Sequence, residues 1–180
     1  KAGSENKTLE KADNAKLEAF VVSDCPYGLQ MQRAMADAVK NAPELASNVI
    51  VRYIGSVSDG KIFSMHDPEA NGIEGKENLR QICLREEQPA KYWDYVSCYM
   101  KKATGKLENG MPIGDTTGCL VSTGVDTSKL NSCMSDSSKG LAYAKVDFDI
   151  SDSYGVSGSP TLFLNGTKIS ESNYGGRSSD

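Results

Sequence analysis

The sequence lacks the residues and patterns that would indicate several common classes of protein. It has one histidine, His66, and no Cys-x-x-Cys pair, so a zinc site of the usual Cys/His type has too few suitably spaced ligands. We therefore expect no metal and no cofactor. The net charge is −4 and Lys and Arg do not cluster, which argues against nucleic-acid binding. No apolar run approaches the roughly 18 to 20 residues that cross a bilayer, so we expect no membrane span.

What the chain does contain is a hydrophobic core and an odd number of cysteines. Its 180 residues are 38% hydrophobic, which suits one packed domain. The five cysteines suggest two disulfides and one cysteine left over. Disulfides imply an oxidising setting, so we predict a secreted, periplasmic or other extracytoplasmic protein. Because the chain starts at Lys1 without an apolar leader, we take it as a mature form whose export signal is absent.

The first part of the chain predicts a βαβ unit. Residues 1–15 are rich in Lys, Glu and Asn and are predicted to form an N-terminal tether. Two β-prone runs, 17–23 and 48–54, flank residues 26–41, where apolar side chains recur at helical spacing. We therefore assign residues 16–66 to one α/β half with a parallel pair of strands.

The middle of the chain predicts a helical insertion over residues 67–138. Four short helical segments are expected there, over residues 77–86, 90–103, 116–123 and 128–135, with a Gly-rich connection at 105–114. The segments carry Cys83, Cys98, Cys119 and Cys133, which we interpret as structural disulfides rather than a metal site because no close pair clamps an ion. Four cysteines allow three connectivities, and the sequence does not choose among them. His66 is predicted to lie in a surface loop before this insertion.

Residues 139–180 are predicted to return the chain to the sheet. Residues 139–154 suggest a helix, although residues 146–150 alternate and also suit a strand. A hairpin is expected from strands at 161–164 and 167–170 around the turn Asn165-Gly166. The remaining residues supply only the start of a further helix, so we expect the last helix of this half to be lacking.

The order of these elements and two short motifs resemble the thioredoxin fold. Cys25-Pro26-Tyr27-Gly28 follows the first strand, where that superfamily carries Cys-x-x-Cys, and Ser159-Pro160 matches its cis-proline. The helical insertion is similar to that of DsbA-like proteins. Further matches are to GILT, the lysosomal thiol reductase, and to the thioredoxin-like region of plant vacuolar sorting receptors, through Glu77-Asn78-Leu79, Trp93-Asp94-Tyr95-Val96, Gly118-Cys119-Leu120 and Ser132-Cys133-Met134-Ser135-Asp136.

This resemblance implies a reactive site around Cys25. Pro26 suits the first helical position, which places Cys25 at the helix N-cap, where the helix dipole and free N–H groups favour a thiolate. Asp24 opposes this, because a neighbouring negative charge disfavours a second one. The resemblance further implies that Pro26, Tyr27, Ser159 and Pro160 bind substrate beside the sulfur.

The departure from the motif limits the chemistry. A dithiol oxidoreductase needs a second cysteine three residues after the first, and that position is Gly28. We predict a monothiol thiol–disulfide oxidoreductase or isomerase-like protein that acts through Cys25 on protein or peptide thiols and disulfides, or on low-molecular-weight thiols. The alternatives are a redox-silent binding or structural module, a module linked to a partner by a disulfide through Cys25, and a Cys25 that serves only as a small buried hydrophobe.

Overall fold

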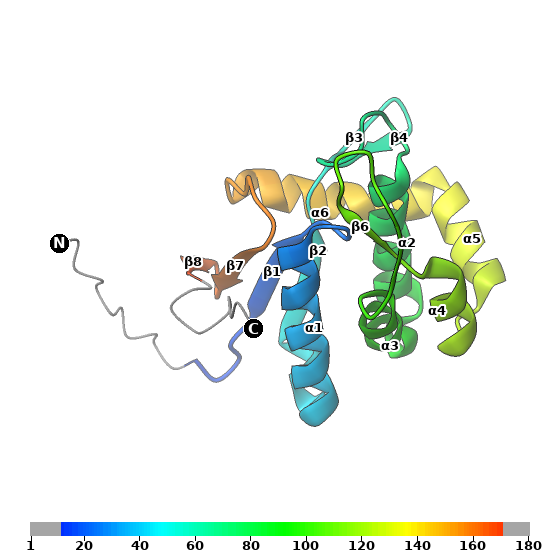
Figure 1. The fold of residues 1–180 in the computed structure, drawn as a ribbon. Coiled ribbons are helices and arrows are strands. Elements are labelled where there is room, and N and C mark those ends of the chain that lie inside the picture. The colour runs from blue at the N-terminus through cyan, green and yellow to red at the C-terminus, as the bar shows by residue number, and fades with distance from the viewer. Residues whose placement is uncertain (1–11, 171–180) are drawn as a thin grey trace.

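Four strands form the central sheet, in the order β2-β1-β7-β8 (Figure 1). The computed structural model describes residues 12–170; the predictions for most of the N-terminal tether and for the end of the chain fall outside these residues. β1 (Leu17–Val21) runs parallel to β2 (Val49–Tyr53) and antiparallel to β7 (Thr161–Leu164). β8 (Thr167–Ile169) pairs with β7 across Asn165 and Gly166, which both have positive φ. The predicted parallel pair and hairpin are therefore confirmed.

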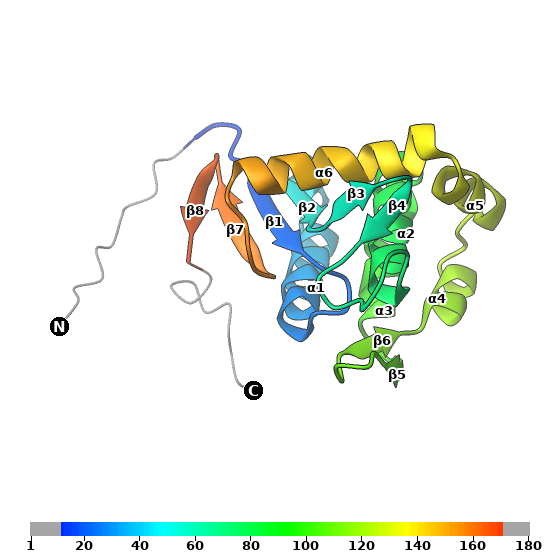
Figure 2. The same cartoon turned by 90° about the horizontal axis from the view of Figure 1, so that it is seen from above.

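Two helices cover opposite faces of this sheet, as Figure 2 shows. α1 (Pro26–Asn41) has the predicted bounds, and α6 (Ala142–Ser153) runs across the other face. The helical alternative was therefore correct for residues 146–150. The physical reason is the burial of Ala144 and Phe148, which lie four residues apart on one helical face, and of Asp147 and Ser151 at the same spacing.

The helical insertion lies beside the β2 edge of the sheet (Figures 1 and 2). The four expected helices are present, as α2 (Ile73–Glu87), α3 (Pro89–Tyr99), α4 (Thr116–Ser122) and α5 (Thr127–Ser135). A π-helical turn, η2 (Ser137–Leu141), leads from α5 into α6. Cys83–Cys133 joins α2 to α5, and Cys98–Cys119 joins α3 to α4. Each disulfide thus links a longer helix to a shorter one.

Two short hairpins and one 3₁₀ turn were not predicted. β3 (Ser56–Ser58) pairs with β4 (Lys61–Phe63) around Asp59-Gly60, and β5 (Ala103–Lys106) pairs with β6 (Pro112–Gly114). The expectation of a continuous helix to residue 103 was wrong, because α3 ends at Tyr99 and the chain enters β5. The 3₁₀ turn is η1 (Pro43–Ser47), after α1. Strands of three or four residues are too short to show a period-two pattern.

Buried polar groups fix the insertion against the sheet. Asp147 of α6 is fully buried and accepts hydrogen bonds from Arg85 of α2 at 2.7 Å, from Arg52 of β2 at 3.2 Å and from the Tyr53 backbone N–H at 3.1 Å. These bonds connect three elements from distant parts of the sequence. Since a buried charge requires such partners, the network sets one orientation of α2 against the sheet.

Candidate functional site

Cys25 occupies the N-cap of α1, as its sequence context predicts. Pro26 is the first helical residue, and the Leu29 N–H donates to the Cys25 carbonyl oxygen at 2.8 Å, which closes the first turn. Proline suits this position because its fixed φ is helical and it has no N–H to satisfy. Cys25 is the free cysteine of the described residues, and only 7% of its surface is exposed.

The residue before Pro160 faces this sulfur. The Ser159–Pro160 peptide bond is cis, and Cys25 Sγ lies 3.4 Å from the Ser159 carbonyl oxygen, to which the thiol donates. Ser159 Oγ accepts from the Val22 N–H at 3.0 Å and so joins the strand-to-helix turn to the start of β7. In this thiol form Cys25 makes no side-chain hydrogen bond to the N–H groups of the helix start. A thiol hydrogen needs an acceptor, and the carbonyl supplies one.

Gly28 stands where a second active-site cysteine would be, and the space beside it is occupied. A Cβ atom at this position would lie 2.6 Å from Ser159 Oγ and 3.1 Å from the Val22 carbonyl oxygen. Ordinary Cβ contacts are longer, so any larger side chain here must displace the Ser159 hydroxyl. The serine that binds the turn also fills the place of the missing thiol.

Asp24, next to Cys25, is a buried acid with one partner for two oxygens. Its side chain is fully buried, and Oδ1 accepts from the Tyr99 hydroxyl of α3, while Oδ2 has no partner within residues 12–170. Burial, helped by the charges of Glu77, Glu74 and Asp67, raises the pKa of Asp24 to about 8, against the opposing effect of the Tyr99 hydrogen bond. Burial thus favours the protonated form of Asp24 and weakens the negative charge that the sequence places beside Cys25.

Helix α2 of the insertion holds the residues just before Cys25. The Ser23 N–H donates to Asn78 Oδ1 at 2.9 Å, and Ser23 Oγ donates to the Glu74 carbonyl oxygen at 3.3 Å. Glu74 also contacts His66, whose Nδ1 lies 2.8 Å from Glu74 Oε2. His66 lies in a turn before α2, as predicted, and its partly exposed side chain is also a partner of a buried carboxyl group.

Several solved structures resemble this chain in fold. A thioredoxin-like oxidoreductase from Silicibacter pomeroyi is 19% identical with a TM-score of 0.54, over 89% of this chain and 82% of that one. Oxidised DsbA from Mycobacterium tuberculosis is 16% identical with a TM-score of 0.59, over 91% of this chain and 80% of that one. The reduced disulfide oxidoreductase DsbG from the same organism is 17% identical with a TM-score of 0.58, over 92% and 77%.

The fold is thioredoxin-like. The fold class predicted from the sequence is confirmed. No protein-family model and no curated protein matches the sequence. At these identities the similarity establishes the thioredoxin-like fold, and function has to be argued from the residues of the site.

The thioredoxin-like fold brings some predicted site residues together and leaves others apart. Cys25, Ser159 and Pro160 meet at the start of α1. Pro160 also borders a pocket of about 430 Å³ that continues along the β7–β8 hairpin. Tyr27, two residues after the buried Cys25, is 53% exposed. The four remaining cysteines form their two disulfides in the insertion.

Two absences concern the described residues only. Within residues 12–170, no group of three or more His, Cys, Asp or Glu side chains is arranged to hold a metal ion. Over the same range, no helix combines the length and the apolar composition needed to span a membrane.

The sequence did not reveal Tyr99 or the role of Ser159 beside Gly28. Tyr99 comes from the insertion, and nothing local indicates that its hydroxyl reaches Asp24. The sequence does place Asp24 between a buried strand and the helix that begins after Cys25. An acid in such a position needs a hydrogen-bond donor, but the sequence does not identify the donor.

Proposed function

We propose that this protein is a thiol–disulfide oxidoreductase that acts through the single sulfur of Cys25 and depends on an external thiol to complete its cycle. The observation that carries this proposal is the position of Cys25 Sγ, at the N-terminus of α1 and 3.4 Å from the carbonyl oxygen that precedes cis-Pro160. The similar solved structures named as disulfide oxidoreductases support the same class of reaction.

The reaction needs two exchanges. The Cys25 thiolate attacks one sulfur of a substrate disulfide, the substrate S–S bond breaks, and the other substrate sulfur leaves as a thiolate. An external thiolate then attacks the substrate sulfur of the mixed disulfide and releases Cys25 as a thiolate. These two exchanges convert the substrate disulfide into one free thiol and one mixed disulfide with the external thiol. A second external thiolate that attacks the external sulfur of this mixed disulfide releases the other substrate sulfur as a thiolate, so that in total the substrate gains two electrons and two external thiols leave as their disulfide.

An internal second thiol is not available for the second exchange. Gly28 has none, and Ser159 fills the adjacent space. Cys83, Cys98, Cys119 and Cys133 are already paired. A mixed disulfide on Cys25 therefore persists until another molecule resolves it, which suits an isomerase-like role toward protein or peptide thiols and disulfides.

The paired cysteines also support a place of action. Two disulfides in a small domain are typical of secreted, periplasmic or other extracytoplasmic proteins. We propose that the protein works in such an oxidising compartment.

The test combines reactivity and turnover. The folded protein, with both disulfides intact, is treated with iodoacetamide across a pH series, and the alkylated site is located by mass spectrometry. We expect Cys25 alkylation at neutral pH to exceed that of glutathione by roughly tenfold. Cleavage of a fluorogenic peptide disulfide by excess glutathione should accelerate with wild type and fall to the uncatalysed rate with Cys25→Ser. A sulfur that reacts no faster than glutathione, together with equal turnover in C25S, overturns the proposal.

A redox-silent binding module is the second candidate, and the burial of Cys25 favours it. Only 7% of the residue is exposed and its thiol is already hydrogen-bonded. This candidate predicts that C25S binds its partner as well as wild type does. A module that is linked to its partner through Cys25 predicts instead that the partner separates from the protein in reducing gels.

A further inference from the structure

The two disulfides of the insertion differ in their access to solvent. Cys83 and Cys133 are 1% and 0% exposed, and the turn at Gly140 lies against the Cys83 sulfur. In Cys98–Cys119, by contrast, Cys119 is 1% exposed while Cys98 is only half-buried. One disulfide is enclosed by protein, and the other includes a half-buried cysteine, Cys98.

The half-buried Cys98 borders a pocket. A space of about 440 Å³ lies between α1, α3 and α4, and the Cys98 side of the disulfide borders it. Exposed Lys40 and Lys101 line this pocket together with one acid, Asp94. The volume suits a small molecule, and the excess of positive charge favours an anionic one.

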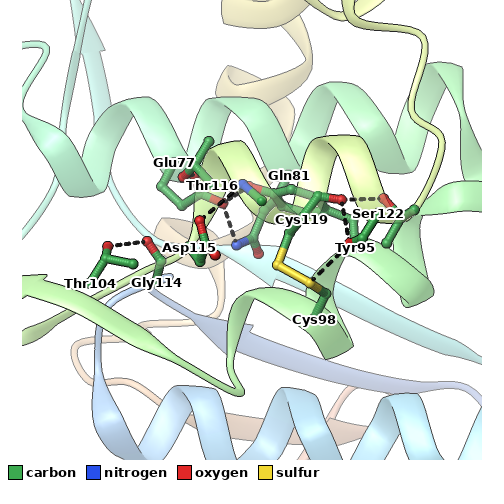
Figure 3. The surroundings of a disulfide bond; sticks show 12 residues. Glu77, Gln81, Tyr95, Cys98, Thr104, Gly114, Asp115, Thr116, Cys119 and Ser122 are labelled. Carbon is green, nitrogen blue, oxygen red and sulfur yellow. Dashed lines mark hydrogen bonds between the residues drawn. A yellow bond between two sulfur atoms is a disulfide. The ribbon is translucent and has the colours of Figure 1, made fainter.

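A hydroxyl group stands beside the same sulfur. Ser122 Oγ lies 3.6 Å from Cys98 Sγ, as Figure 3 shows with Cys119 on the other side of the bond. Because a disulfide sulfur carries no hydrogen, only the Ser122 hydroxyl can donate in this contact, and the Cys119 carbonyl oxygen at 3.5 Å is the alternative acceptor for its single hydrogen. The same hydroxyl can donate to a thiolate that forms on Cys98.

We propose that Cys98–Cys119 is a second redox site, which exchanges with an anionic low-molecular-weight thiol that enters the pocket between α1, α3 and α4. The thiolate attacks Cys98 Sγ, the Cys98–Cys119 bond breaks, and its electron pair leaves on Cys119, which takes up a proton. A second thiolate attacks the small-molecule sulfur bound to Cys98 and displaces Cys98 as a thiolate beside Ser122. In total, two small thiols are oxidised to their disulfide and the protein disulfide gains two electrons.

The experiment uses the full chain with Cys25→Ser, so its result does not depend on any activity of Cys25. The protein is exposed to 2-mercaptoethanesulfonate, an anionic thiol, and new thiols are trapped and mapped by mass spectrometry. We expect Cys98 and Cys119 to be labelled at least roughly tenfold faster than Cys83 and Cys133, while the circular dichroism of the fold is unchanged. Equal labelling of both pairs, or labelling of Cys98 and Cys119 only on unfolding, overturns the proposal.

Variants separate the pocket and the hydroxyl from general accessibility. Lys40→Glu/Lys101→Glu should slow exchange with mercaptoethanesulfonate by roughly fivefold but should not slow exchange with the cationic thiol cysteamine. Lys16→Glu/Lys145→Glu has the same net charge outside the pocket and should leave both rates unchanged. An equal loss with both thiols, or in both double variants, contradicts an anion-accepting pocket.

Ser122→Ala tests the hydroxyl against a matched serine. Ser135 also ends a short helix that carries a disulfide, and its hydroxyl donates to the carbonyl three residues earlier, as that of Ser122 does. We expect S122A to slow release of the mixed disulfide by a few-fold and S135A to leave it unchanged. An unchanged rate in S122A excludes the proposed part of Ser122 in the exchange.

Discussion

The sheet region and the helical insertion are held together in different ways. β1 is flanked by hydrogen-bonded strands on both sides, and its residues from Glu18 to Val21 are all buried. The insertion is built around the buried helix α2, and two of the helices against it are short: α4 has 7 residues and α5 has 9, lengths at which isolated helices are unstable in water. Both disulfides lie in the insertion, whereas the free cysteine lies at the sheet.

The free cysteine thus lies where hydrogen-bonded strands hold the chain, and the two disulfides lie where short helices meet longer ones. Each disulfide adds stability to the insertion mainly by restricting the unfolded chain. The polar network around Asp147 then connects the two regions.

The largest effect is expected from breaking that connection. Asp147→Ala should lower the free energy of unfolding by about 3–5 kcal/mol, because Arg85 and Arg52 lose their buried counter-charge. Asp149→Ala is the matched control on the same helix: its ion pair with Lys145 is exposed, so the loss should be about 0.5 kcal/mol or less. Urea denaturation measures both. Similar losses in the two variants would show that the regions do not depend on this network.

Removing the disulfides one at a time compares how much each of them stabilises the fold. Cys83→Ala/Cys133→Ala opens a link of sequence separation 50 and should cost about 4 kcal/mol, whereas Cys98→Ala/Cys119→Ala opens one of separation 21 and should cost about 3 kcal/mol. Thermal unfolding followed by circular dichroism measures the order. The reverse order would show that packing around Cys98–Cys119 contributes more than chain entropy.

The buried acid beside Cys25 predicts a pH dependence. Folding raises the pKa of Asp24 from 3.8 to about 8, so its carboxyl binds its proton more tightly in the folded state. The resulting stability is fully present below pH 3.8 and is lost as pH rises through about 8. Asp24→Asn cannot ionise, and relative to wild type it should gain a few kcal/mol between pH 4 and pH 9, since each pKa unit is worth about 1.4 kcal/mol.

The measurement is urea denaturation of both proteins at the two pH values. Near pH 4 the two should differ little, because the folded-state carboxyl is neutral and the unfolded-state one, with its pKa of 3.8, is only about half ionised, which changes the free energy of unfolding by less than about 1 kcal/mol. A stability difference that is independent of pH would mean that Asp24 ionises normally in the fold. Glu77 of the insertion differs from Asp24 in its hydrogen bonds. Both oxygens of this buried carboxyl have partners, which are Arg80, Gln81, Tyr95 and Thr116, whereas Asp24 Oδ2 has none among the described residues.

The sequence predicted the main elements of the fold because their signals are local. Periodic apolar residues defined α1, and Asn165-Gly166 between two apolar runs defined the last hairpin. The pairing of the four insertion cysteines was not predictable, because it depends on how the four helices pack against one another. The same holds for Asp24, whose state depends on Tyr99 from another helix.

For the candidate site, the sequence identified Cys25 and the missing thiol at Gly28, but not the contact between Gly28 and Ser159. These residues are far apart in the chain, and only the fold places them together. This contact also distinguishes the candidate site from the insertion. In the insertion each cysteine is bonded to another cysteine, whereas at the site the group next to Gly28 is the Ser159 hydroxyl.

Changing Gly28 should therefore have a smaller effect that depends on Ser159. Gly28→Ala should cost about 1–3 kcal/mol, because the added Cβ meets Ser159 Oγ at 2.6 Å. Ser159→Ala should cost about 1 kcal/mol through the lost acceptor for the Val22 N–H. In the S159A background the alanine at position 28 should cost less than about 1 kcal/mol, so the two changes couple. Urea denaturation of wild type, the two single variants and the double variant measures this coupling. If the two costs simply add, the Val22 carbonyl oxygen, rather than the Ser159 hydroxyl, is what keeps a side chain out of position 28.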